Sequence, residues 1–482
     1  MSAGLTLVVL FLASGLAYGQ QAPKLKLGSL DLSVGWRTRT EVWDWFEGAS
    51  GNSNYTFWHS MLRVGVGQSR QRLDWYVEAE QPAILGLPAD AVVAAPQGQL
   101  GLGGTYFTAN TQHTNNVGAF LKQAFVHIKQ LGPASVRLGR FELFDGMEVR
   151  PKDATLAVVV QSRVAHRLIS NFSFSAVQRT FDGAEVALTS GPNNLTLFAA
   201  RPTAGVFQVD GMDDLHVEAY YGAYTRSVTT PGGTGALRLF VLGYVDDRTT
   251  VVKTDNRPLP ARAADSAKIK IVTYGASYAH VFSTKSGGQF DAVLWGALQG
   301  GAWGVLSHRA AAYVAEVGWQ PHLTTVNPWL SVGYSYGSGD GNPNDTRHGT
   351  FFQVLTTPRQ YARTPFYNMM NNRDAYATLN LRPSAKLALR SEVHALSLVR
   401  ASDLWYLGGG AFQPGSFGYT GRPSGGQTRL ANVWDLSADC AVSRSVALTL
   451  YYGHVWGKGV ITSIYPRDTA AQLLYLETLV HF

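Results

Sequence analysis

The amino-acid sequence predicts an all-β fold, namely an antiparallel transmembrane β-barrel of about 18 strands. Three observations lead to this prediction: an export signal at the N-terminus, strand segments in which apolar and polar residues alternate, and an apolar last segment that ends on Phe482. The stretch LDLSVGWRTRTEVW (30–43) shows the alternation, since leucine, valine and tryptophan share one face while Arg37 and Arg39 share the other. In an outer-membrane barrel the apolar face meets lipid and the arginines point into the lumen, whereas a soluble sandwich would expose the arginines to water.

The N-terminal stretch MSAGLTLVVLFLASGLAYGQ has the features of a secretory signal peptide. An uncharged apolar run from Leu5 to Ala17 ends in a small-x-small cleavage site at Gly19, so we expect a signal peptide over residues 1–19 and a single barrel domain over residues 20–482. An N-terminal membrane anchor is the alternative, but it would need a longer apolar run. The single cysteine, Cys440, excludes an intramolecular disulfide framework.

Composition and the C-terminus favour the membrane barrel over the soluble sandwich. Charged residues make up only 15% of the chain while aromatic residues make up 12%, which suits strands with aromatic girdles. The last segment, AQLLYLETLVHF, is apolar at alternate positions and ends on Phe482, and it resembles the assembly signal of bacterial outer-membrane barrels. We therefore expect the protein in the bacterial outer membrane, with lipid as a partner.

Eighteen segments have the alternation or the apolar, β-branched composition of a strand. They are 28–46, 56–70, 71–82, 117–130, 134–142, 182–190, 194–201, 214–227, 236–246, 267–283, 289–301, 309–320, 328–337, 372–382, 385–398, 430–442, 445–457 and 470–482. An even number is typical of single-chain bacterial barrels. The connections alternate as well: short turns are expected at the periplasmic end, and the longest connections, 83–116, 143–181, 338–371 and 399–429, are expected as extracellular loops.

A barrel of this size is too wide for its own side chains to fill, so the lumen lining is expected to carry the function. Five arginines on inward positions would form a basic lining: Arg37, Arg39, Arg63, Arg137 and Arg390. The other residues predicted to face inward are Glu41, His59, Asp74, Glu78, Arg238, Lys268, Lys270, Lys386, Glu392, Asp435 and Asp439. With a net charge of +7, such a lining would attract anions, and the planar guanidinium suits carboxylates. The alternative is that each arginine only pairs with an inward acid and holds the wall.

Two stretches go beyond this general pattern. SRVAHRLISNFSFSAVQRTFDGAEV (162–186) and GDGNPNDTRHGTFFQVLTTPRQYAR (339–363) resemble the alginate-export family of outer-membrane porins, and DLWYLGG (403–409) is also similar to a segment of that family. The resemblance runs across nearly the whole mature chain.

The resemblance implies a monomeric 18-stranded barrel with a narrow, arginine-lined, anion-selective path for an acidic polysaccharide, gated by loops that fold into the lumen. Carried onto this sequence, the motif residues are Arg167, Arg179 and Asp182 in the first stretch, and Arg347, His348 and Phe351 in the second. Arg167, Arg179 and Arg347 would guide carboxylates from the loops. A periplasmic export or synthase complex would be the partner that supplies the polymer.

Other functions remain open at this stage. A general or small-anion diffusion porin is the main alternative, and an outer-membrane barrel enzyme or an adhesin is a weaker one. Ser391 and His394 lie on opposite faces of one strand, which argues against a catalytic pair, and no Gly-x-Ser-x-Gly elbow occurs.

Histidine and cysteine spacings typical of zinc sites are absent, so neither a metal nor another cofactor is expected, and a nucleic-acid partner is not expected. GDGNPND (339–345) spaces Asp340 and two asparagines as calcium loops do, but a turn-rich surface loop is the default expectation.

Overall fold

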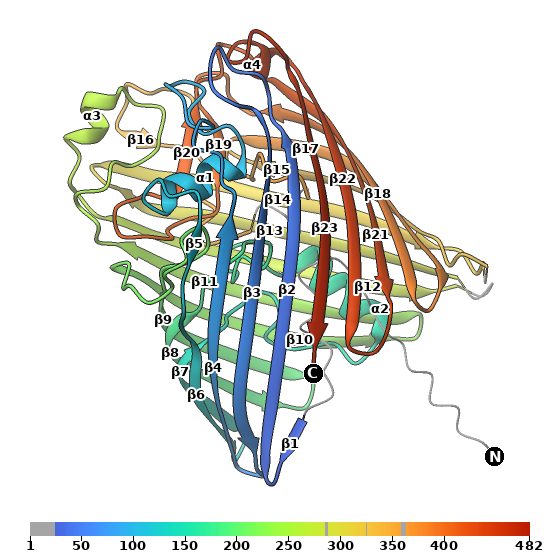
Figure 1. Cartoon of the computed structure of the whole chain (residues 1–482). Helices are drawn as coiled ribbons and strands as arrows, with labels where there is room; N and C mark the ends of the chain where they lie inside the picture. Colours follow the sequence, from blue (N-terminus) through green and yellow to red (C-terminus); the bar gives the residue numbers. More distant parts are fainter. Residues whose placement is uncertain (1–24, 285–287, 324, 358–362) are drawn as a thin grey trace.

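The computed structural model describes residues 25–284, 288–323, 325–357 and 363–482. In this part of the chain, eighteen long strands pair antiparallel with their neighbours, and β2 pairs with β23, which closes the sheet into a barrel (Figure 1). These strands are β2 (Leu30–Asp44), β3 (Asn54–Ser69), β4 (Leu73–Leu85), β6 (Phe120–Leu131), β7 (Ala134–Phe141), β8 (Phe181–Ser190), β9 (Asn193–Pro202), β10 (Val217–Thr230), β11 (Gly233–Asp246), β12 (Ile269–Ser283), β13 (Gln289–Trp303), β14 (Leu306–Gln320), β15 (Trp329–Gly337), β17 (Asn372–Ser384), β18 (Leu387–Leu398), β21 (Arg429–Ala441), β22 (Val446–Gly457) and β23 (Ala470–His481). All of the predicted strands are confirmed to within three residues at either end.

The remaining elements are short. They are the strands β1 (Leu25–Leu27), β5 (Asn116–Val117), β16 (Arg347–His348), β19 (Trp405–Gly408) and β20 (Tyr419–Arg422), and the helices α1 (Leu102–Ala109), α2 (Ala154–Val159), η2 (Val160–Val164), α3 (Leu259–Ala263) and α4 (Gly459–Thr462). No helix among the described residues is long and apolar enough to cross a membrane.

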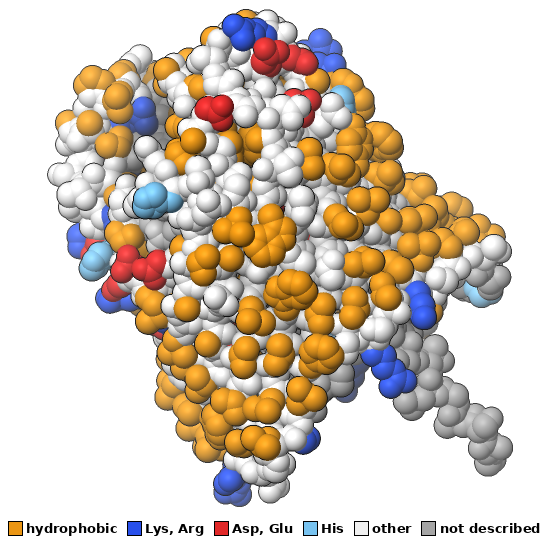
Figure 2. All heavy atoms as spheres, viewed as in Figure 1, with side chains coloured by type: hydrophobic (Ala, Val, Ile, Leu, Met, Phe, Trp, Pro, Cys, Tyr) orange, Lys and Arg blue, Asp and Glu red, His pale blue; other side chains and the backbone are white. Residues whose placement is uncertain are grey.

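The strand alternation sorts side chains between lipid and interior as the sequence predicts. On β2, Arg37 and Arg39 are buried inside the barrel, while Trp36 and Val42 are exposed on its outer face. Figure 2 shows hydrophobic side chains covering the outer surface of the strands. Many of the exposed large apolar residues lie on strands, for example Leu294 and Leu298 on β13, as expected for a surface that meets lipid.

Long connections gather at one end of the barrel and short turns at the other. The longest are 86–119, 142–180, 338–371 and 399–428, and they leave the strands at the end that carries α1, β19 and β20 (Figure 1). The connections at the opposite end include 70–72, 132–133, 191–192, 231–232 and 385–386. The C-terminus also lies at this end, which is the periplasmic end in an outer-membrane barrel.

The prediction that Lys268 and Lys270 face inward is wrong. Both side chains are exposed, and it is Ile269 and Ile271 that are buried inside. Ile269 pairs with Trp303 of β13, which is also buried on the inner side. The lysines therefore lie on the outer face near the loop end, where Lys268 forms an ion pair with Asp247.

Candidate functional site

Residues 142–180, which connect β7 to β8, form an inner segment that crosses the barrel interior. This segment contains α2 and η2, and its contacts reach strands on opposite sides of the ring. Arg39 of β2 donates to Phe174 O at 3.0 Å, and Lys122 of β6 donates to Val177 O at 3.1 Å. At its other end Arg163 lies 3.4 Å from Glu316 of β14. The inner segment thus occupies the space that the strands alone would leave open.

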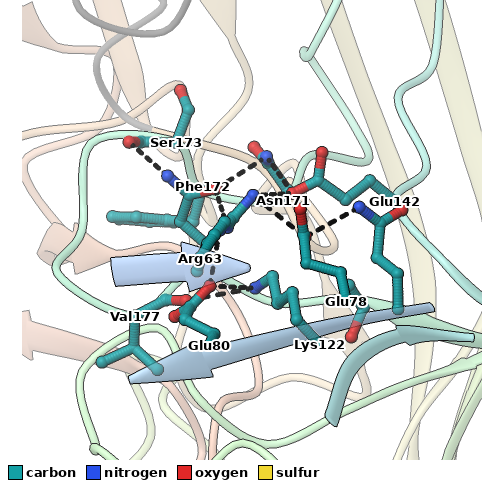
Figure 3. A network of polar contacts seen from close by, with 12 residues as sticks. Arg63, Glu78, Glu80, Lys122, Glu142, Asn171, Phe172, Ser173 and Val177 are labelled. Atoms are coloured by element: carbon teal, nitrogen blue, oxygen red, sulfur yellow. Dashed lines mark hydrogen bonds and ion pairs between the residues drawn. The ribbon is translucent and has the colours of Figure 1, made fainter. Parts of the chain in front are cut away.

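Arg63 on β3 is the centre of a buried polar network that joins the wall to the inner segment (Figure 3). Its Nε donates to Glu80 Oε2 at 2.7 Å and its Nη1 donates to Glu142 Oε1 at 3.1 Å. Lys122 lies 3.5 Å from the same Glu80 oxygen. Burial alone would raise the pKa of Glu142, but Arg63 and Lys122 outweigh this effect and hold the pKa below its usual value.

Arg37 and Arg39 are held in a similar way. Arg39 donates from Nε to Glu477 Oε2 at 2.9 Å and lies 3.2 Å from Glu41, while its guanidinium carbon lies 4.1 Å from the centre of the Phe174 ring. Arg37 donates to the main-chain oxygens of the inner segment at Ser173 and Ser175. Both guanidinium groups are buried, so these contacts take the place of water.

The other two arginines predicted to line the lumen are less buried. Arg137 on β7 pairs with Glu185 on β8 at 2.9 Å, and Arg390 on β18 pairs with Glu392 on the same strand. About a quarter of each arginine side chain is exposed. All five arginines predicted to line the lumen therefore face the interior, and each has a carboxylate within ion-pair distance.

Three arginines of the family-like stretches, Arg167, Arg179 and Arg347, were predicted to guide carboxylates, and they have three different surroundings. Arg167 lies 3.5 Å from Glu316 and donates to Arg163 O. Arg347 on β16 is exposed, and its guanidinium forms no ion pair with any residue that the structure describes. The remaining arginine, Arg179, is fully buried at the end of the inner segment.

Arg179 differs from Arg167, the other buried arginine of these three. It donates one hydrogen bond, from Nη2 to Gly409 O at 2.9 Å, while its Nε and Nη1 have no hydrogen-bond partner. No carboxylate lies within ion-pair distance of it in the described part of the chain. Burial lowers the pKa of Arg179 to about 10, so the group still carries a charge at neutral pH. A buried cation without an anion is costly, which makes this side chain a candidate contact for an anionic ligand.

The three family-like stretches meet in space. Leu355 N donates to Leu168 O at 2.9 Å, which joins the second stretch to the first, and Arg179 joins the first to the third through Gly409. Asp403 of the third accepts hydrogen bonds from Asp340 N at 2.8 Å and from Thr350 Oγ1 at 2.6 Å. The motifs are therefore parts of one loop assembly.

The GDGNPND loop, where calcium was the alternative, is a set of turns. The Asp340 carboxylate accepts hydrogen bonds from Asn342 N at 2.8 Å and from Gly349 N at 2.9 Å, and Asn342 Oδ1 accepts one from Asn344 N at 3.1 Å. These oxygens cap main-chain N–H groups, as side chains in Asx turns do. The default expectation of a turn-rich loop agrees with this arrangement.

Two cavities remain in the interior, one at the short-turn end and one among the loops. One of about 460 Å³ lies at the short-turn end, and its lining includes Asp74, His127, Arg137 and Glu185. Another, of about 80 Å³, lies among the loops. It is lined by aromatic residues that include Trp45, Phe172 and Phe412, with Arg422 as its charged residue. Because Phe172 belongs to the inner segment and neighbours Gly409, this second cavity is close to Arg179.

The closed barrel with a polar, loop-filled interior defines the chain as an outer-membrane channel of the porin type. Solved structures with this fold include the outer membrane protein OpdK from Pseudomonas aeruginosa, with a TM-score of 0.54 and 8% sequence identity over 94% of this chain and 99% of that one. OccAB2 from Acinetobacter baumannii is similar at a TM-score of 0.57 and 10% identity, over 94% and 98% of the two chains. No curated protein matches the sequence significantly.

The family is shown by the sequence itself. The model of the alginate export family matches residues 90–459, which is most of the chain. The protein belongs to the alginate export family. The resemblance carried by residues 162–186, 339–363 and 403–409 is thereby confirmed, and the family and fold are those of channels and porins rather than of enzymes.

Proposed function

We propose that this outer-membrane channel exports an anionic polysaccharide of the alginate-like, polyuronate type through a lumen lined by arginines. The proposal rests mainly on Arg179. Its buried guanidinium has two nitrogens without a hydrogen-bond partner and no carboxylate nearby among the described residues. It lies where the three family-like stretches meet. A uronate carboxylate supplies the missing anion and the bidentate geometry that a guanidinium prefers.

The paired arginines fit the same function. Arg37, Arg39, Arg63, Arg137, Arg167 and Arg390 are held by glutamates or main-chain oxygens, and a passing uronate offers the same chemical group as those glutamates. A carboxylate that enters can take the place of Glu142 on Arg63 or of Glu185 on Arg137, so the guanidinium keeps an anionic partner during the exchange. Such an exchange lowers the barrier to movement of a polyanion. Arg347, exposed on the loop side, would meet the polymer as it leaves.

The direction and the partners belong to the same proposal. The polymer would pass from the periplasm to the outside, supplied by a periplasmic export or synthase complex or driven by its own concentration gradient. The chain would act as a monomer that reaches the outer membrane after cleavage of a signal peptide near Gly19. Residues 1–24 lie outside the described part of the structure.

Efflux from proteoliposomes tests this function. Vesicles that contain the purified protein are loaded with fluorescent oligomannuronate, or with a neutral dextran of equal length, and the release of each is followed. We expect release of the uronate to exceed that of the dextran. Equal release of both would contradict an anionic polysaccharide as the preferred cargo.

A small-anion porin is the second candidate, and the aromatic cavity favours it. This cavity combines Trp45, Phe172 and Phe412 with the cation Arg422, a lining suited to an aromatic carboxylate. A crystal structure of OpdK, which shares the fold at a TM-score of 0.53 and 8% identity, was determined with vanillate. Competition of vanillate with oligomannuronate in the efflux assay distinguishes the two: inhibition by vanillate at low concentration would favour the small-anion function.

A further inference from the structure

Two neighbouring strands bring three potential metal ligands together inside the barrel. Glu392 and His394 are two residues apart on β18 and therefore share a face, and Asp435 on β21 lies directly opposite Glu392 in the strand register. One ligand atom from each of the three lies within 4.8 Å of the others, and all three side chains are buried.

Glu392 presents one oxygen without a partner. Its Oε1 accepts hydrogen bonds from Thr378 Oγ1 at 2.9 Å and from Arg390 Nη2. Its Oε2 is buried and has no hydrogen-bond partner. A buried carboxylate oxygen with no donor is costly, whereas a cation placed there would satisfy it.

His394 is oriented in the way that metal-binding histidines usually are. Its Nδ1 lies 2.9 Å from Asp374 Oδ2, and that carboxylate also accepts a hydrogen bond from Tyr367 at 2.8 Å. The ring stacks on Tyr376 at 5.5 Å between centres, which fixes its plane. Its Nε2 is buried without a partner. A carboxylate that accepts from Nδ1–H fixes the orientation of the ring and makes Nε2 a more basic, and so a better, ligand.

Asp435 is anchored as well. Its Oδ2 accepts from Arg363 N at 3.0 Å and its Oδ1 accepts from Thr364 Oγ1 at 3.1 Å and from the Tyr451 hydroxyl. Each carboxylate oxygen has two lone pairs, so Asp435 keeps capacity for one more partner. All three candidate ligands are thus held by outer contacts that fix their side chains, as in established metal sites.

We propose that Glu392, His394 and Asp435 form a binding site for a divalent transition metal ion, with Zn²⁺ as the ion that suits one imidazole and two carboxylates. The ion would join β18 to β21 on the inner face of the barrel. A water molecule would complete a tetrahedral set. A cavity of about 50 Å³, lined by Glu392, Arg390 and Thr378 among others, lies next to the site.

Metal binding by the whole protein tests the proposal. The purified full-length chain in detergent is freed of metal with a chelator and titrated with Zn²⁺ alone, with the bound metal measured by elemental analysis and by calorimetry. We expect one Zn²⁺ per chain in the wild type, and loss of at least about 100-fold in affinity for His394→Gln and for Glu392→Gln. Asp374→Asn, which removes only the partner of Nδ1, is expected to weaken binding by about 10- to 100-fold.

The matched control is His59→Gln, which changes another buried inward histidine whose partner is Glu41. This variant should bind Zn²⁺ like the wild type. Co²⁺ added to the wild type provides a second readout that needs no variant, because a tetrahedral site gives visible absorption bands that Zn²⁺ then removes. A wild-type chain that binds no stoichiometric Zn²⁺ and shows no such bands, or a folded His394→Gln chain that binds Zn²⁺ as well as the wild type, would overturn the proposal.

Discussion

Arg39 on β2 and Glu477 on β23 form an ion pair across the seam where the first and last long strands close the barrel. The two residues are directly opposite each other in the strand register, and Arg39 donates from Nε to Glu477 at 2.9 Å. Neither side chain is more than 5% exposed. The two residues are 438 positions apart in the chain. Their buried ion pair therefore couples closure of the barrel to the polar contacts of its interior.

Removal of one partner from this pair should destabilise the closed barrel. We expect Glu477→Gln to lower the free energy of unfolding by roughly 3–5 kcal/mol, because it leaves Arg39 charged and buried without its main anion. Urea unfolding of the protein in lipid vesicles measures the change. The double variant Arg39→Met/Glu477→Met is the control, and it should be closer to the wild type than Glu477→Gln because it removes Arg39 together with its main anion. A double variant as unstable as Glu477→Gln would show that charge pairing is not the cause.

The inner segment should control ion selectivity through Glu142. Its carboxylate neutralises part of Arg63, so Glu142→Gln keeps the shape while it increases the positive charge in the interior. We expect the ratio of anion to cation permeability to rise by about twofold or more, measured from the reversal potential under a salt gradient. Glu47→Gln, a change of the same kind at an exposed site on the loop side, should leave this ratio unchanged. An unchanged ratio in Glu142→Gln would mean that ions pass elsewhere.

Arg179 is expected to strengthen the binding of oligomannuronate and to lower the free energy of unfolding of the protein. We predict that Arg179→Met raises the free energy of unfolding by about 1–3 kcal/mol, because it removes buried N–H groups that have no acceptor. The same change should raise the oligomannuronate concentration needed for half-maximal block by about tenfold, equivalent to roughly 1.4 kcal/mol. Arg201→Met, an exposed arginine with its own acidic partners, serves as the control for both measurements. A variant that is less stable and binds equally well would assign Arg179 a structural role.

The loop assembly should show a pH dependence that comes from Asp403. Burial raises the pKa of Asp403 to about 6, although hydrogen bonds from Thr350 and others oppose the shift. A carboxyl group with a raised pKa in the folded state binds more protons when folded, so stability is greatest below the ordinary pKa near 4 and falls as the pH rises to about 6.

The expected loss over this range is about 3 kcal/mol, and it should level off above pH 6. Urea unfolding at pH 4 and pH 7 measures the free energy of unfolding at each pH, and Asp403→Asn should make the difference between the two values smaller by that amount. A wild type and an Asp403→Asn variant with equal pH dependence would contradict the shift.

The strands of this barrel could be predicted from the sequence because a period of two is a local property. Arg37 and Arg39 were placed inside, and Trp36 outside, from one stretch of chain. The same reasoning failed at Lys268 and Lys270, because it assumed that the charged face of every strand points inward, whereas the apolar side chains Ile269 and Ile271 are the inward ones here. The alternation of residues along a strand assigns side chains to its two faces, but it does not say which face points into the barrel.

The partners of the arginines could not be predicted. Arg37 donates to Ser175, 138 residues away, and Arg179 donates to Gly409, 230 residues away, and both contacts depend on how loops fold into the barrel. The cluster of Glu392, His394 and Asp435 left a weaker signal that was missed. Its Glu-x-His spacing on a strand puts two ligands on one face, but only the pairing of β18 with β21 brings Asp435 opposite Glu392.

The measurement that tests the central claim most directly is the current through the purified protein in a planar bilayer, with reversal potential recorded first and block by oligomannuronate second. We predict an anion-selective current that oligomannuronate blocks at low concentration and that a neutral dextran of equal length does not. A current with no preference for anions, or one that both polymers block equally, would contradict an arginine-lined path for an acidic polysaccharide.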